Sequence, residues 1–385
     1  MKDVPVRVVA CLAITGLAAC GGSPSMPSTV TAVATTPTPP PARALTVNDI
    51  SILFPLGRGD LWTASMPGRD ALPLLPRSAM DLPGRAVIRE LQGGDATYAG
   101  IRVVSLRFDP CFGDPCHPQI RLVFQALNAA GTSAFDGAFH ALYNLTPDEF
   151  AAVTVRLRAL GAQAPENAPV TRLEVSPALL AQGMSGAYAT GLRDLVAQYA
   201  SGSNLAKFTF MTRNQGGGDR WDFGGINLRD FEPRGGFDIP TLGATLQTVR
   251  ESGGRGSVYA YTVTPGILRG ELARVLSSAD AQNATAGERQ LGVDALARAE
   301  NPAISSPDTI DCAGCHLANR IRGHLQTTFN TNSALSFVSA SEIRRLVGGS
   351  ETDPDNLRAF GYFNANPAIA QRTANETIKV LAAMR

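Results

Sequence analysis

Short apolar runs, each bounded by Gly, Pro, Asp or Asn, recur along the first two thirds of the chain. Their length and their content of β-branched and aromatic residues are typical of strands. Strands are predicted at 86–90, 101–108, 119–126, 205–213, 242–249 and 258–263, and the run 136–143 around His140 is predicted to be a further, half-buried strand. The glycines at 216–218 stand between two apolar runs and predict a hairpin loop.

Helix starts are marked by capping residues. Thr146 and Glu149 have capping-box spacing with Pro147 at the first helical position, and apolar residues then recur at helical spacing as far as Gly161. A second helix is predicted after Ser176, and an apolar stripe over 192–199 predicts a third. Capping-box spacing recurs at 285–288, 339–342 and 373–376.

The order of these elements predicts an α+β fold. Predicted strands concentrate before about residue 265 and predicted helices after it, which favours an α+β region at 45–265 and a mainly helical region at 266–385. Because no linker-like stretch separates the two, a single compact unit is the alternative.

The N-terminus has the pattern of an export signal. Lys2 and Arg7 precede an apolar run that is too short to span a bilayer and ends in small residues. The sequence Leu17-Ala18-Ala19-Cys20 resembles the lipobox of bacterial lipoproteins. That resemblance implies removal of residues 1–19, lipidation of Cys20 and attachment to a membrane through acyl chains. An ordinary secreted protein with an incidental cysteine is the alternative.

Residues 20–44 comprise the lipidated cysteine and a segment rich in Pro, Ser and Thr, which is predicted to be a solvated tether. No acidic residue follows Cys20 to signal retention at the inner membrane of such lipoproteins. We therefore expect an outer-membrane lipoprotein of the bacterial cell envelope, with its periplasmic or surface orientation open.

Charge identifies no partner class. The chain has 34 Lys+Arg and 33 Asp+Glu, a net charge of +1, and removal of residues 1–19 makes it neutral. A nucleic-acid-binding protein needs a clear basic excess, so nucleic acid is excluded as a partner.

The strongest chemical signal is Cys312-Ala313-Gly314-Cys315-His316. Two thiols three positions apart on one turn can reach the two vinyl groups of a haem, and the following His lies beneath the iron. This segment resembles the haem-attachment motif of c-type cytochromes. The resemblance implies one covalent haem c, held by Cys312 and Cys315, with His316 as the proximal iron ligand. A Cys312–Cys315 disulfide or redox pair is the alternative.

The distal ligand stays open. Met384 is one residue from the end of the chain, and His324 would lie about 12 Å along a continuous helix from His316. His324 can therefore serve only if Gly323 breaks that helix. His140 is the third candidate, with a core or edge histidine as its other interpretation, and Met184 and Met211 are further sulfur donors. An iron without a sixth ligand would favour small-ligand binding or peroxide chemistry.

A second cysteine pair, Cys111 and Cys116, is followed by His117 and surrounded by prolines between two predicted strands. This context favours a disulfide that closes a tight connection, and a second haem site is the alternative.

Together these patterns predict a membrane-anchored haem lipoprotein with a role in electron transfer or haem-based redox chemistry. The partner expected for such a protein is a redox protein. Peroxidase-like activity is expected only with five-coordinate iron. The rival hypothesis is a surface binding or structural lipoprotein with two disulfides and no haem.

Overall fold

The computed structural model describes residues 44–77, 98–112, 116–164, 172–214, 219–229, 232–252, 258–266, 270–338, 344–345 and 357–385. The chain divides into two units, Met1–Pro40 and Pro41–Arg385, and the fold described below is that of the second. The export signal, Cys20, the predicted strand 86–90 and the predicted capping box 339–342 lie outside the described residues.

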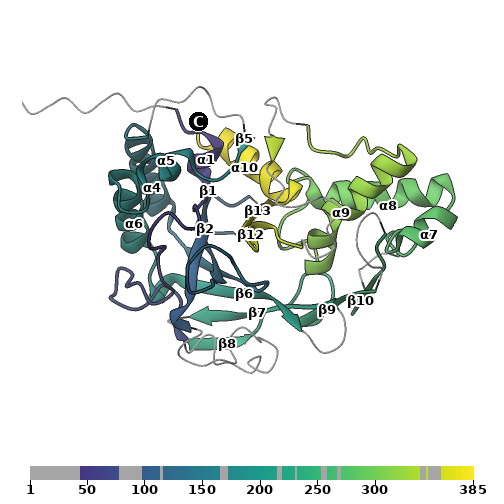
Figure 1. Ribbon diagram of the computed structural model, residues 1–385, viewed down its shortest axis with the longest axis horizontal. Helices are drawn as coiled ribbons and strands as arrows, with labels where there is room; N and C mark the ends of the chain where they lie inside the picture. The colour runs from purple at the N-terminus through teal and green to yellow at the C-terminus, as the bar shows by residue number, and fades with distance from the viewer. Residues whose placement is uncertain are drawn as a thin grey trace, which may run out of the picture. The chain divides into compact units, whose positions relative to one another are not determined.

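Runs of strands and runs of helices follow one another along the second unit (Figure 1). The helices are α1 (Val47–Ile50), α4 (Pro147–Gly161), α5 (Pro177–Gln182), α6 (Ala187–Tyr199), the 3-10 turn η2 (Gly202–Asn204), α7 (Ser278–Asn283), α8 (Ala286–Glu300), α9 (Cys312–Phe329) and α10 (Gln371–Ala383). The strands are β1 (Ser51–Leu53), β2 (Ile101–Asp109), β3 (Gln119–Ala126), β4 (Ala138–Asn144), β5 (Arg172–Leu173), β6 (Leu205–Asn214), β7 (Asp219–Arg229), β8 (Glu232–Gly236), β9 (Leu246–Glu251), β10 (Tyr261–Thr264), β11 (Arg344–Arg345), β12 (Phe360–Phe363) and β13 (Asn366–Ile369).

Within the described residues, nine strands form one antiparallel sheet in the order β1-β2-β3-β4-β6-β7-β9-β10, with β8 paired to β7. β6 and β7 are antiparallel neighbours, as a hairpin requires, and the loop predicted at 216–218 lies outside the described residues. Side chains alternate between the two faces of a strand, so every second residue of β2, β3, β4 and β6 faces the same side. That alternation places the residues of the candidate site on one face.

Several predicted helix starts are confirmed. Thr146 and Glu149 form the reciprocal capping box of α4, and Thr285 and Glu288 form that of α8. Ser176 accepts a hydrogen bond from the Leu179 amide at the start of α5. These local bonds satisfy amides that have no partner inside the helix.

The predicted capping box at 373–376 is wrong. Helix α10 begins earlier, at Gln371, and both side chains are used elsewhere. The Thr373 hydroxyl donates to the Ala359 carbonyl at 2.8 Å, while the Glu376 carboxylate pairs with Arg107 and Arg372. Tertiary contacts therefore override the local spacing.

The α+β prediction is confirmed, and the prediction of a mainly helical part after residue 266 is confirmed in part. Helices α7 to α10 lie there, but so do strands β11, β12 and β13. No helix among the described residues is long and apolar enough to cross a membrane.

Buried apolar side chains form two clusters that do not divide at residue 265. The first joins β1 to β4 with α4, α5, α6, β12 and α10, and it includes Phe108, Phe139 and Val380. The second joins β7, β9 and β10 with α7, α8 and α9, and it includes Trp221 and Leu317. The last helix thus packs with the first strands, and the predicted boundary near residue 265 stays a prediction.

Candidate functional site

Helix α9 begins at the first cysteine of the motif, and its first turn is anchored by side chains. Asp311 is the N-cap, and its Oδ1 accepts hydrogen bonds from the Gly314 amide at 2.8 Å and from the Gln247 amide group at 3.0 Å. The side-chain oxygen of Gln247, Oε1, in turn accepts a hydrogen bond from the Ala313 backbone amide at 2.8 Å. Because Gln247 is a fully buried residue of β9, this network fixes the turn Cys312–His316 against the sheet.

The two cysteines of this turn are three residues apart, so they lie on one side of the helix. Neither is in a disulfide, and both line the same pocket. Burial raises the pKa of each thiol to about 12, and for Cys312 the neighbouring Cys315 adds to the effect. Both thiols are therefore protonated at neutral pH, whereas thiol–disulfide exchange requires a reactive thiolate.

His316 is held in one orientation. Its Nδ1 lies 2.5 Å from the Leu357 carbonyl oxygen, and its ring packs at 4.8 Å from the ring of Phe223. Since a carbonyl only accepts, Nδ1 carries the proton and the Nε2 lone pair is left for another partner. Burial lowers the pKa of His316, which favours the neutral ring. A metal-binding histidine has this arrangement, with its second nitrogen donating to a carbonyl.

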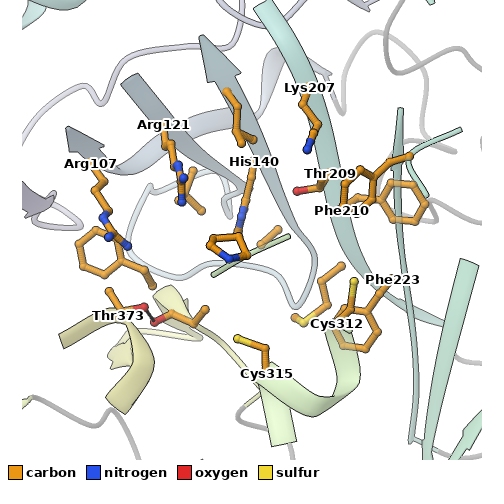
Figure 2. A pocket seen from close by; sticks show the side chains of 18 of the residues that line it. Arg107, Arg121, His140, Lys207, Thr209, Phe210, Phe223, Cys312, Cys315 and Thr373 are labelled. Atoms are coloured by element: carbon orange, nitrogen blue, oxygen red, sulfur yellow. Dashed lines mark hydrogen bonds between the residues drawn. The ribbon is translucent and has the colours of Figure 1, made fainter. Parts of the chain in front are cut away.

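A pocket of about 480 Å³ lies beside this turn. Its walls come from the sheet strands β2, β3, β4, β6 and β7, from the first turn of α9, from the segment 358–361 and from α10. Figure 2 shows side chains from the strands and from the helices converging on the same space. This volume lies in the range of roughly 300–1,000 Å³ that is usual for small-molecule and cofactor sites.

His140 extends into this pocket from β4, opposite the helix that carries Cys312 and Cys315 (Figure 2). In the sheet it is paired with Val123 of β3 and Thr209 of β6, which also line the pocket. Burial lowers the pKa of His140 to about 4, with smaller contributions from His316 and Arg121. The ring is therefore neutral at pH 7, and His316 lines the same pocket.

The pocket also carries several cations: Arg107, Arg121, Lys207, Arg358 and Arg372. Arg107 and Arg372 pair with Glu376, and Arg121 lies 3.1 Å from the Asp109 carboxylate. Lys207 lies 3.7 Å from the Asp308 carboxylate and Arg358 pairs with Asp136, so each of these cations has a carboxylate partner. Because an arginine or lysine can donate to more than one acceptor, these cations can also bind the anionic groups of a ligand with an apolar body.

The remaining candidate ligands are placed elsewhere. The His324 ring packs edge-on against Tyr259 at 5.2 Å and Phe329 at 5.7 Å, and it does not line the pocket. α9 continues unbroken through Gly323, so the break that His324 would need is not present. Met384 and Met184 are buried in the first apolar cluster, also away from the pocket. Met211 does line it.

Cys111 and Cys116 form a disulfide, and both line the pocket together with the exposed His117. The Cys111 amide donates to the Asp109 carboxylate at 2.9 Å. The disulfide thus closes the connection between β2 and β3 at the edge of the site.

The donor set fits a haem. Two thiols on one turn can bond to its vinyl groups, an oriented His316 offers Nε2 to iron, and the arginines can pair with its propionates. Among the described ranges no group of three or more His, Cys, Asp or Glu residues could hold a bare metal ion. Iron brought by a porphyrin needs only axial ligands from the protein.

The sequence did not indicate the Leu357 carbonyl, Gln247 or the arginine set. A backbone carbonyl leaves no signal in a sequence, and Gln247 lies in a strand 64 residues before Asp311 without a motif of its own. Arg107 and Arg121 are polar positions within apolar strands, and that signal could have marked them.

Comparison with known proteins finds no matching family model, no matching curated protein and no matching solved structure.

Proposed function

We propose that this chain carries one covalent haem c and transfers electrons in the bacterial cell envelope, where it is anchored as a lipoprotein. The observation that carries the proposal is the first turn of α9. Its two protonated thiols and the neutral His316 line one pocket, and the hydrogen bond from Nδ1 to the Leu357 carbonyl leaves Nε2 of His316 free for a ligand.

The haem supplies a one-electron redox centre that no side chain here provides. The chain's own residues do the rest. Cys312 and Cys315 would hold the group in place, His316 would bind the iron, and Arg107, Arg121 and Arg372 could donate to the propionates. The axial ligands and the burial of the group would set its reduction potential.

The alternative chemistry of this turn, a thiol–disulfide pair, is weaker on physical grounds. Thiols whose pKa is raised to about 12 are poor nucleophiles, and active redox cysteines have lowered pKa values. The rival without haem, a binding or structural lipoprotein, would use the same cationic pocket for another ligand.

Haem attachment is tested by producing the exported chain with and without the bacterial machinery for cytochrome c maturation. Haem-stained denaturing gels should show a stained band only with the machinery. The C312S/C315S variant should lose the band, while H324Q should keep it as a matched control on the same helix. A wild-type chain that is unstained under both conditions would support the rival without haem.

The lipid anchor is a separate part of the proposal and rests on the lipobox and Cys20. Labelling with a radioactive fatty acid and separating the membranes should place the wild-type chain in the outer-membrane fraction. C20A should be unlabelled and leave that fraction. Equal labelling of both chains would contradict the anchor but leave the haem proposal intact.

A further inference from the structure

We infer that His140 is the second axial ligand of the iron, so that the haem is held between two histidines. The inference rests on the proposed function, because it assigns the face of the iron opposite His316. His140 lies on β4, and the turn Cys312–His316 follows it by more than 170 residues. Local sequence spacing therefore does not indicate that the two histidines bind one iron.

Position is the first argument. His140 occupies the middle of β4, which has β3 on one side and β6 on the other. A side chain on an interior strand is held rigidly, as an axial ligand must be. The ring enters the pocket from the wall facing the helix of Cys312 and Cys315 (Figure 2). His316 lines the same pocket from that helix, so the two histidines border one space.

The exposure of the ring is the second argument. His140 is only partly buried, and it lines the pocket. An imidazole that opens onto a cavity can donate the lone pair of one nitrogen to a metal held there.

Competing donors are less well placed. Met211 also lines the pocket, but its side chain belongs to the apolar cluster with Trp221 and Phe223 and needs no other partner. In the sheet Met211 is paired with Ala138, which lies two residues before His140 on β4 and faces the same side of the sheet. Met211 and the exposed His117, which also lines the pocket, are therefore the donors that the experiment must separate from His140.

The test uses the full chain loaded with haem. Electron paramagnetic resonance and absorption of the ferric protein report the spin state, and near-infrared magnetic circular dichroism separates His–His from His–Met ligation. The wild type should be low-spin with His–His ligation. H140A should be high-spin and return to low-spin when imidazole is added, whereas M211L and H324Q should match the wild type.

A second variant guards against misfolding of H140A. H140M should stay low-spin, change to His–Met ligation and have a higher reduction potential, because a Met ligand raises the potential. A high-spin wild type, or a low-spin spectrum of H140A equal to that of the wild type, would overturn the inference. A low-spin spectrum lost in M211L instead would assign the ligand to Met211.

The two proposals fail in different ways. Haem that survives denaturation in every variant, together with unchanged spectra in H140A, refutes only the role of His140. Absence of covalent haem from the wild type refutes the proposed function and, with it, the inference.

Discussion

Asp311 has two roles at the start of α9. Its carboxylate caps the helix through the Gly314 amide and accepts a hydrogen bond from the buried Gln247 side chain. The residue therefore links the turn Cys312–His316 to β9, and a change at this position should affect the geometry of the whole site.

We predict that D311A lowers the free energy of unfolding by about 2 kcal/mol, because it removes the cap and leaves the buried Gln247 amide with one acceptor fewer. D311N keeps an oxygen that can accept from both groups and should stay within about 0.5 kcal/mol of the wild type. Urea denaturation followed by circular dichroism measures both. Equal losses in the two variants would mean that charge, rather than capping, is what matters here.

For single residues, the sequence predicts a site correctly when the functional residues are neighbours in the chain. The spacing of Cys312, Cys315 and His316 predicts their shared turn without any knowledge of the fold. The contacts of His140, by contrast, depend on how β4 is placed opposite α9, and nothing in the residues around it distinguishes a ligand from a core histidine. The Leu357 carbonyl is hidden for the same reason, since it reaches His316 from a distant segment.

The connection between β2 and β3 is a short element closed by the disulfide Cys111–Cys116. Cys111 has a φ of 60°, a left-handed conformation that costs energy for a residue other than glycine. The disulfide to Cys116 therefore holds Cys111 in this conformation at the edge of the pocket.

We predict that C111S/C116S lowers the free energy of unfolding by about 2 kcal/mol, the entropy expected from opening so short a loop. Its haem content after maturation should remain one per chain, because neither residue is in the turn Cys312–His316. Thermal denaturation and haem quantification check the two parts. If the double variant contained half as much haem per chain as the wild type, the result would support a second haem at Cys111 and Cys116.

Elements were predicted well where local signals and tertiary packing agree. The strands at 101–108 and 119–126 are β2 and β3 almost to the residue, because both are apolar runs with clear turn residues at their ends. The strand predicted at 242–249 begins later, at Leu246. The residues before it form a turn, in which the Leu242 amide donates a hydrogen bond to the Ile239 carbonyl. Strand β8 was missed because its residues Glu232–Gly236 carry no apolar pattern.

Across the whole molecule, α10 is tied to the sheet by charge. Burial alone would raise the pKa of Glu376, but Arg107, Arg372 and Arg121 outweigh burial and bring it down to about 2. Glu376 is thus ionised in the folded state at pH values where it would be protonated in the unfolded chain.

The sign of the pH dependence follows from that difference. The lowered pKa contributes about 3 kcal/mol of stability above the unfolded value near 4.5, and this contribution is lost as the pH falls from about 4.5 toward 2. E376Q should remove this part of the pH dependence and lower stability at pH 7 by about 3 kcal/mol, since two buried arginines lose their ionic partner. Urea denaturation of both chains between pH 2 and 7 measures the difference. Parallel curves for E376Q and the wild type would contradict the assignment.

At the scale of the whole molecule the sequence predicted the α+β class but not the pocket. Its walls come from strands, helices and a connecting segment that the sequence separates by up to about 270 residues. The pairing of β1 to β4 with β6 to β10 in one sheet, and the packing of α10 onto its first strands, depend on long-range burial that local patterns do not contain.

Covalent haem at the turn Cys312–His316 can be measured by a pyridine haemochrome spectrum of the matured full-length chain after denaturation and acid–acetone extraction, with haem expressed per mole of protein. We expect one haem per chain that resists extraction, with the absorption of a haem whose vinyl groups are saturated. A chain that gives up all its haem to the solvent, or that never held any, would contradict this expectation.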